Sequence, residues 1–411
     1  PLGARALEGS NPSPGAILRV HIPSIFRMEM RRLARASKAW SEKPELGRSA
    51  LVDSSYTTVD TRLGFYPKIN ESNPMRVYLL GAGASYGYDT TLPSISVPPL
   101  TNEFFSKGVK WEILTESRYP SLINRLKLEY RWEGTNQKDD LAKIQIDIEP
   151  FLAKLGREFE EGKPYAQGVL GETAYFILDL LKRYAITGRN SFDCYRHLAL
   201  SYLNTPFYVI TLNYDVLLES AANAVGLSYS YGEPVPPQSI PIAKPHGSIS
   251  WLNPIGHGIA LGGLKSGDTT TAARYIYSNV IKTARPVMLP VQNVVALRDL
   301  DIVRSGNDYY EPIIVPPQGE FKDYRKFSLI EEVWRWAQEM INFADEIVIV
   351  GCSLRQEDSR LWNLITSLRA NANVTIVNPS AEELERGIFE RNSKVQLQSP
   401  FKSFEDFVKT L

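Results

Sequence analysis

The chain has 411 residues, a formal net charge of +0 and 43% hydrophobic residues. This length fits two or three domains, or one α/β domain with a large insertion, and the apolar fraction is enough for a packed core. The balanced charge argues against direct binding of nucleic acid. The two cysteines exclude a four-thiolate zinc site and a disulfide framework. Since we also find no apolar run that could span a bilayer and no signal peptide, we expect a cytoplasmic protein without membrane association.

Residues 1–74 form an N-terminal extension in our division of the chain. Pro1–Ser10 resembles the remnant of an expression tag and is left out of the fold prediction. Ser24–Trp40 predicts a basic amphipathic helix. This helix either packs on the protein itself or on a neighbouring subunit, or it docks a partner protein or nucleic acid. The extension is therefore predicted to serve docking or oligomerisation.

The first readable strand runs into a glycine turn. Arg76–Leu80 is a short apolar run without a breaker, and Gly81, Ala82 and Gly83 follow it directly. A helix starting near Ala84 or Ser85 would point its positive dipole end at this turn. Such a turn lets backbone N–H groups approach a phosphate, although an ordinary tight connection between strand and helix explains the glycines equally well.

A long helical stretch follows the glycine turn. Residues 86–100 contain many turn formers and predict a loop over the site. Residues 101–203 predict an inserted helical subdomain, with Thr101 as an N-cap, because about a hundred residues are too many for a simple crossover. Within it, residues 148–159 and 172–184 carry apolar side chains at helical spacing.

Polar residues follow the next strands. Residues 207–212 predict a second strand, which Asn213 and Asp215 follow before a helix over 216–225. Polar side chains at the carboxyl end of a parallel strand face the ligand crevice, and Asp215 can also cap the helix. His246 lies between Pro245 and Gly247, after a short apolar segment, and its ordinary pKa of about 6.5 suits acid–base chemistry.

The rest of the chain predicts a mainly parallel, doubly wound Rossmann-like sheet. Residues 256–308 are rich in loops and predict a lid or small insertion. Strands and helices then alternate, with strands at 312–317, 346–350, 373–377 and 394–397 and helices at 327–344, 359–369, 381–389 and 404–411. We therefore divide the α/β domain into residues 75–100 and 204–411. The strand ends at Gly81, Asn213, Gly351 and Asn378 indicate a dinucleotide crevice.

Five motifs in this order resemble the sirtuin family, and more closely the sirtuin-like domains of bacterial antiphage defence proteins. They are Gly81-Ala-Gly-Ala-Ser85, Thr211-Leu-Asn-Tyr-Asp215, Lys244-Pro-His-Gly-Ser248, Gly351-Cys-Ser353 and Asn378-Pro379. The resemblance covers Met75 to about Leu397 and implies NAD binding. It implies pyrophosphate contacts from Gly81, Ala82, Gly83 and Ser85, nicotinamide-ribose contacts from Asn213 and Asp215, and adenosine contacts from Gly351, Ser353 and Asn378. His246 matches the family's catalytic histidine.

Two departures from the sirtuin pattern shape the expected activity. Where sirtuins continue with Gly-Ile-Pro-Asp-Phe-Arg, this chain has Val97-Pro-Pro-Leu-Thr-Asn102, and the cysteine pairs of the sirtuin zinc module are missing. Both favour hydrolysis of NAD over protein deacylation. The resemblance thus implies a metal-independent NAD hydrolase with His246 and Asn213 as catalytic residues, acting in antiphage defence by NAD depletion.

Other functions stay open at this point. An NAD-dependent deacylase or ADP-ribosyltransferase is one alternative, and a non-catalytic sensor of NAD or ADP-ribose is another. A constantly active hydrolase would be toxic, so we expect a gate. This gate would be homo-oligomerisation or contact with a defence partner such as an ATPase, an Argonaute or a nucleotide-sensing protein.

Overall fold

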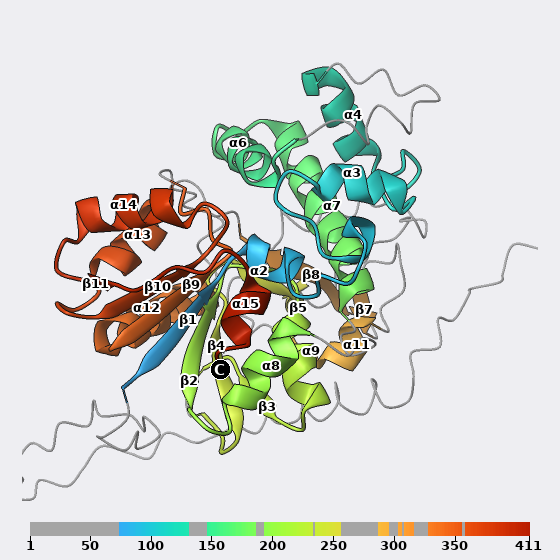
Figure 1. Ribbon diagram of the computed structural model, residues 1–411. Coiled ribbons are helices and arrows are strands. Elements are labelled where there is room, and N and C mark those ends of the chain that lie inside the picture. The colour runs from blue at the N-terminus through green and yellow to red at the C-terminus, as the bar shows by residue number, and fades with distance from the viewer. Residues whose placement is uncertain are drawn as a thin grey trace, which may run out of the picture. The chain divides into compact units, whose positions relative to one another are not determined.

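The computed structural model describes residues 74–130, 146–185, 193–232, 235–255, 287–295, 303–305, 308–315, 328–355 and 358–411 (Figure 1). All of these belong to one unit, Tyr56–Leu411. Three predicted segments lie wholly or largely outside the described residues, namely the tag remnant predicted at 1–10, the basic helix predicted at 24–40 and the insertion predicted at 256–308. The predictions made for those segments therefore stay predictions.

A seven-stranded sheet carries the fold, in the order β11-β10-β9-β1-β2-β4-β3. Every pairing within it is parallel, which confirms the doubly wound architecture predicted from the alternating strands and helices. The strands are β1 (Arg76–Leu80), β2 (Phe207–Thr211), β3 (Ser228–Ser230), β4 (Ser239–Ala243), β9 (Glu346–Val350), β10 (Asn373–Val377) and β11 (Gln396–Leu397).

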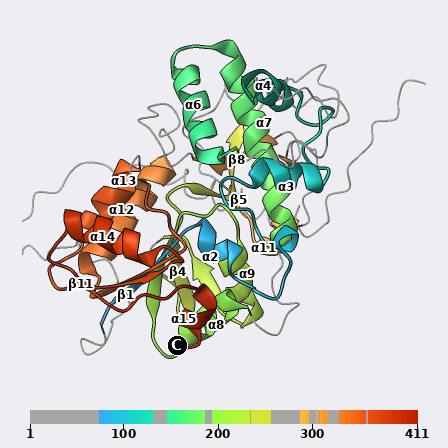
Figure 2. The same cartoon turned by 45° about the horizontal axis from the view of Figure 1, so that its top comes forward.

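Alternation along β1 divides the core into two layers. Val77 and Leu79 pack with α12 (Ser328–Phe343), α13 (Ser359–Thr366) and α14 (Ala381–Arg391) on one face. Tyr78 and Leu80 pack with α8 (Cys194–Ser201), α9 (Leu217–Ala224) and α15 (Phe404–Val408) on the other (Figures 1 and 2). Because successive side chains of a strand point to opposite faces, an unbroken apolar run needs helices on both sides.

The helical stretch before β2 forms its own packed group (Figure 2). It contains α3 (Phe104–Lys110), α4 (Pro120–Tyr130), α6 (Ile148–Glu160) and α7 (Pro164–Leu181), and α3, α4 and α6 each contact α7. Phe105 stacks on Phe176 with ring centroids 5.7 Å apart. Thr101 does not cap a helix, because α3 begins only at Phe104. Its hydroxyl instead donates to the Asp147 carboxylate, 3.1 Å away.

A second, antiparallel sheet was not predicted. Its order is β6-β5-β8-β7, with β5 (Gly247–Ile255), β6 (Val287–Met288), β7 (Val303–Ser305) and β8 (Asp308–Ile314). The strand predicted at 312–317 is therefore the end of β8, which pairs with β5 and not with the parallel sheet. Within the predicted 256–308 insertion, the described residues form β6, β7 and the short helix α11 (Val291–Val295). Gly247 has φ +86°, and a Cβ there would lie 2.1 Å from the Ile313 carbonyl oxygen.

Candidate active site

The glycine turn after β1 lies at the switch point of the sheet. β1 is flanked by β2 on one side and β9 on the other, so β2 to β4 lie on one side of β1 and β9 to β11 lie on the other. Gly81 and Gly83 pack against Gly351. A Cβ added to Gly81 would lie 2.7 Å from a backbone atom of Gly351, and a Cβ added to Gly83 would lie 2.8 Å from another. The amides of Gly81 and Gly83 donate to the carbonyls of Val350 and Gly351, both at 2.9 Å. These glycines thus let two strand ends meet, and their amides are engaged within the protein.

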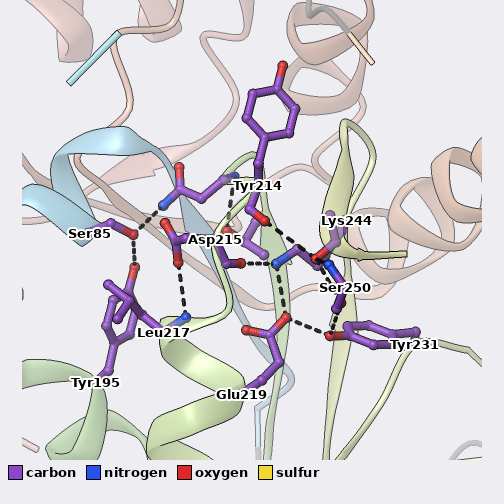
Figure 3. Close-up of polar contacts among 12 residues, drawn as sticks. Ser85, Tyr195, Tyr214, Asp215, Leu217, Glu219, Tyr231, Lys244 and Ser250 are labelled. Atoms are coloured by element: carbon purple, nitrogen blue, oxygen red, sulfur yellow. Dashed lines mark hydrogen bonds and ion pairs between the residues drawn. The ribbon is translucent and has the colours of Figure 1, made fainter. Parts of the chain in front are cut away.

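Asn213 and Ser85 meet at this turn, because they follow two neighbouring strands. Asn213 Nδ2 donates to the Gly81 carbonyl and to Ser85 Oγ, both at 2.8 Å. Ser85 Oγ is also hydrogen-bonded to the Tyr195 hydroxyl at 2.9 Å (Figure 3). All three side chains are buried, so the Asn213 amide has one defined orientation.

Asp215 links this group to a second buried network. Its carboxylate accepts from the Leu217 amide at the start of α9, at 3.0 Å, and burial raises its pKa although Lys244 opposes the shift. Its backbone carbonyl accepts from Lys244 Nζ, which also contacts Glu219 at 2.9 Å (Figure 3). Lys244 and Glu219 are 0% and 1% exposed. Sequence reasoning missed this pair, since charged residues are rarely fully buried and only the fold shows that they face each other.

His246 lies in the turn between β4 and β5 and is 4% exposed. Burial lowers its pKa from 6.5 to about 4, a hydrogen bond with the Leu212 backbone opposes this, and the charge of Arg360 adds to it. The imidazole is therefore neutral near pH 7, and its pKa is not the ordinary value assumed from the sequence. Since Leu212 directly precedes Asn213, the two predicted catalytic residues lie at the same edge of the sheet.

Asp358 faces His246 and was not predicted as a site residue. Its Oδ1 accepts from the Leu361 amide at 3.0 Å and so caps α13, while its Oδ2 lies 3.9 Å from His246 Nε2. Burial raises the pKa of Asp358 to about 6. An acidic residue before an amphipathic helix reads as an N-cap, and nothing in the sequence connects it with a histidine so distant along the chain.

The residues predicted for the adenosine side follow β9 and β10. Asn378 Nδ2 donates to the Cys352 carbonyl at 3.0 Å, and its Oδ1 accepts from the Ser380 amide at 2.9 Å. Ser353 is exposed. Asn378 therefore fixes the loop after β9, and its predicted contact with a nucleotide stays a prediction.

A polar cavity of about 620 Å³ lies at the opposite ends of the strands. Arg76, Glu346 and Asn373, the first residues of β1, β9 and β10, contribute to its lining. Parallel sheets of this type bind ligands at the carboxyl ends of their strands, so we place the candidate site at that edge. Among the described residues, no cluster of three or more His, Cys, Asp or Glu side chains is arranged to hold a metal ion. None of the helices in the described ranges combines the length and apolar character needed to cross a bilayer.

Comparison with known proteins finds no matching family profile and no matching curated protein. Among solved structures, Sir2 in complex with an inhibitor, 2'-O-acetyl-ADP-ribose and a deacetylated peptide matches with 14% identity and a TM-score of 0.36, over 82% of this chain and 91% of that chain. A Sir2–peptide–NAD+ complex matches with 14% identity and a TM-score of 0.36, covering 82% and 92%. A sirtuin structure concerned with substrate affinity matches at 12% identity, with a TM-score of 0.33 and coverage of 82% and 92%. At this level of similarity the matches assign no function.

Proposed function

We propose that the protein hydrolyses NAD+ to nicotinamide and ADP-ribose. The observation that carries the proposal is a buried, neutral histidine, His246, hydrogen-bonded to the residue before Asn213 at the switch point of a doubly wound sheet. The nicotinamide–ribose bond is already activated, because a neutral amine leaves from a cation. The transition state resembles an oxocarbenium ion, so the site has to supply orientation and electrostatic support more than a strong nucleophile.

The two residues would divide the work. Asn213 Nδ2 is held by Gly81 and Ser85, which would leave its side-chain oxygen to accept a hydrogen bond from a ribose hydroxyl or from water. His246 Nε2 is buried and has no hydrogen-bond partner among the described residues. A neutral imidazole nitrogen can take up a proton as a general base. The motifs at both residues, which resemble those of sirtuins, support the choice of NAD+ as substrate.

The proposal is tested by product analysis of NAD+ incubated with the full chain. We expect His246→Ala and Asn213→Ala to lower the hydrolysis rate about 100-fold or more, as loss of a general base or an orienting group does. His197→Ala is the matched control, since His197 is exposed on α8 and lies outside the proposed site. Undiminished turnover in both site variants would disprove these roles.

The cellular role is a separate part of the proposal. We assign the hydrolase to antiphage defence by NAD+ depletion, supported by the resemblance of its motifs to those of defence-type proteins. We expect a gate that involves self-assembly or a partner protein. Incubation of NAD+ with the chain alone and with the products of neighbouring genes tests this gating. NAD-dependent deacylation of an acyl-peptide without background hydrolysis would instead favour a deacylase, and saturable NAD+ binding without any product would favour a sensor.

A further inference from the structure

His246 and Asp358 present two hydrogen-bond acceptors to each other. The His246 ring bonds to the Leu212 backbone, and its Nε2 has no partner among the described residues, so Nδ1 is the nitrogen that donates to the Leu212 carbonyl. In the neutral ring the proton therefore sits on Nδ1, and Nε2 carries a lone pair. Asp358 uses Oδ1 for the Leu361 amide, and its Oδ2 lies 3.9 Å from Nε2.

Other groups around the pair leave this arrangement intact. The rings of Tyr214 and Trp334 lie 6.5 and 5.9 Å from the imidazole, centroid to centroid. Arg360 lowers the pKa of both His246 and Asp358, but its guanidinium stacks on Trp334 and is paired with Glu331 at 2.6 Å. Burial raises the pKa of the Cys352 thiol, which therefore stays protonated. Near pH 7 the pair is thus a neutral imidazole beside a carboxylate.

We propose that His246 Nε2 and Asp358 Oδ2 together hold the water molecule that attacks the ribose of NAD+, which makes Asp358 a second catalytic residue. This inference rests on the proposed hydrolase function. If a water oxygen lies about 2.8 Å from both atoms, the angle Nε2–O–Oδ2 at that oxygen is roughly 90°, close to the H–O–H angle of water. A ligand hydroxyl has one proton and satisfies one acceptor, whereas water satisfies both and keeps its lone pairs for attack.

The proposed step balances without a further reactant. The C1'–N bond of the ribose breaks first, and the electron pair of that bond leaves with neutral nicotinamide. The water oxygen then forms a bond to C1'. One water proton passes to His246 Nε2 and from there to solvent. The other stays on the new hydroxyl, which faces Asp358. One water is consumed and one proton is released.

Asp358→Asn tests the water site, because Asn still accepts from the Leu361 amide and so keeps the helix cap. Two reactions are measured with NAD+, namely hydrolysis and the exchange of bound for labelled nicotinamide, which cleaves the same bond without water. We expect hydrolysis to fall about 100-fold or more and exchange to change less than about threefold. Asp193→Asn is the matched control, since Asp193 caps α8 and burial likewise raises its pKa to about 6.

The possible outcomes distinguish failure of the proposed water site from failure of the proposed hydrolase function. Equal loss of hydrolysis and exchange in Asp358→Asn would overturn the water site and leave the hydrolase intact. A wild-type protein that neither hydrolyses nor exchanges, alone or with its partners, would overturn the hydrolase. The pH profile gives an independent readout. We expect wild-type hydrolysis to rise with pH through about 6 and this limb to move to lower pH in Asp358→Asn. An unmoved limb would contradict a role for the Asp358 carboxylate.

Discussion

The buried ion pair of Lys244 and Glu219 allows a quantitative test of how much this pair stabilises the fold around Asp215. Lys244 Nζ contacts Glu219 at 2.9 Å and donates to the Asp215 carbonyl, and both side chains are almost fully buried. Lys244→Met removes the cation and leaves the carboxylate uncompensated. Loss of one partner of a buried pair costs about 3–5 kcal/mol. We therefore expect the free energy of unfolding to fall by about that amount.

The double variant Lys244→Met, Glu219→Met sharpens this expectation. It removes both members of the charged pair, but the Asp215 carbonyl and the Tyr231 hydroxyl each lose a partner. One unsatisfied buried group costs about 1–3 kcal/mol, so we expect the double variant to be more stable than Lys244→Met.

Urea unfolding followed by tryptophan fluorescence measures these free energies, since the chain contains seven tryptophans. Lys127→Met is the control, because Lys127 pairs with the exposed Glu116 and its loss should cost less than about 1 kcal/mol. A loss below about 1 kcal/mol in Lys244→Met, or a double variant that loses the sum of the single losses, would refute the reasoning.

The remaining predictions concern the carboxyl edge of the sheet. Gly351→Ala should prevent folding, because Gly351 has φ +61° and a Cβ would lie 2.1 Å from the Ala84 amide nitrogen. Gly387→Ala is the control and should fold normally, because the nearest atom to a Cβ there lies 3.7 Å away. A soluble Gly351→Ala protein with the wild-type Tm would disprove the packing argument. Because burial raises the folded-state pKa of Asp358, the wild type loses stability as pH rises from about 4 to about 6. Asp358→Asn removes this loss. It should stabilise the protein by up to about 3 kcal/mol above pH 6 and have no effect below pH 3.5. His246 has a lowered pKa, so it makes the wild type gain stability as pH rises from 4 to 6.5, and His246→Gln should abolish this gain. Stability differences from wild type that do not depend on pH, in both variants, would contradict the pKa shifts of Asp358 and His246.

The parallel sheet could be predicted because its strands carry a local signal. β1, β2, β9 and β10 are short apolar runs that end at a glycine or a polar residue, and each lies within one residue of its predicted bounds. The antiparallel sheet could not be predicted in this way. Its pairing joins Gly247 to Ile314 across a long stretch of chain. The positive φ of Gly247, where β5 begins, cannot be read from the spacing of apolar residues along the sequence.

The candidate site was predictable to a similar extent. Asn213 and Ser85 follow neighbouring strands, and their contact follows from the order of the sheet. Asp358 lies at the far end of the connection between β9 and α13, and its position opposite His246 depends on how α13 packs on the sheet. The glycines of the first turn carried a signal for close backbone approach, but the sequence could not show that the approaching backbone is that of Gly351.

Asp193 and Asp358 show why geometry, and not a raised pKa, singles out the second of them. Both cap a helix, both are buried, and burial raises the pKa of both to about 6. Asp193 uses one oxygen for the amides of Tyr195 and Arg196, which is what a cap requires. Asp358 meets the same requirement with one oxygen and directs the other at an imidazole nitrogen that lacks a partner. For stability alone, an apolar residue at position 246 would be better than a buried nitrogen without a hydrogen bond. This cost is the reason why we propose a chemical role for both groups.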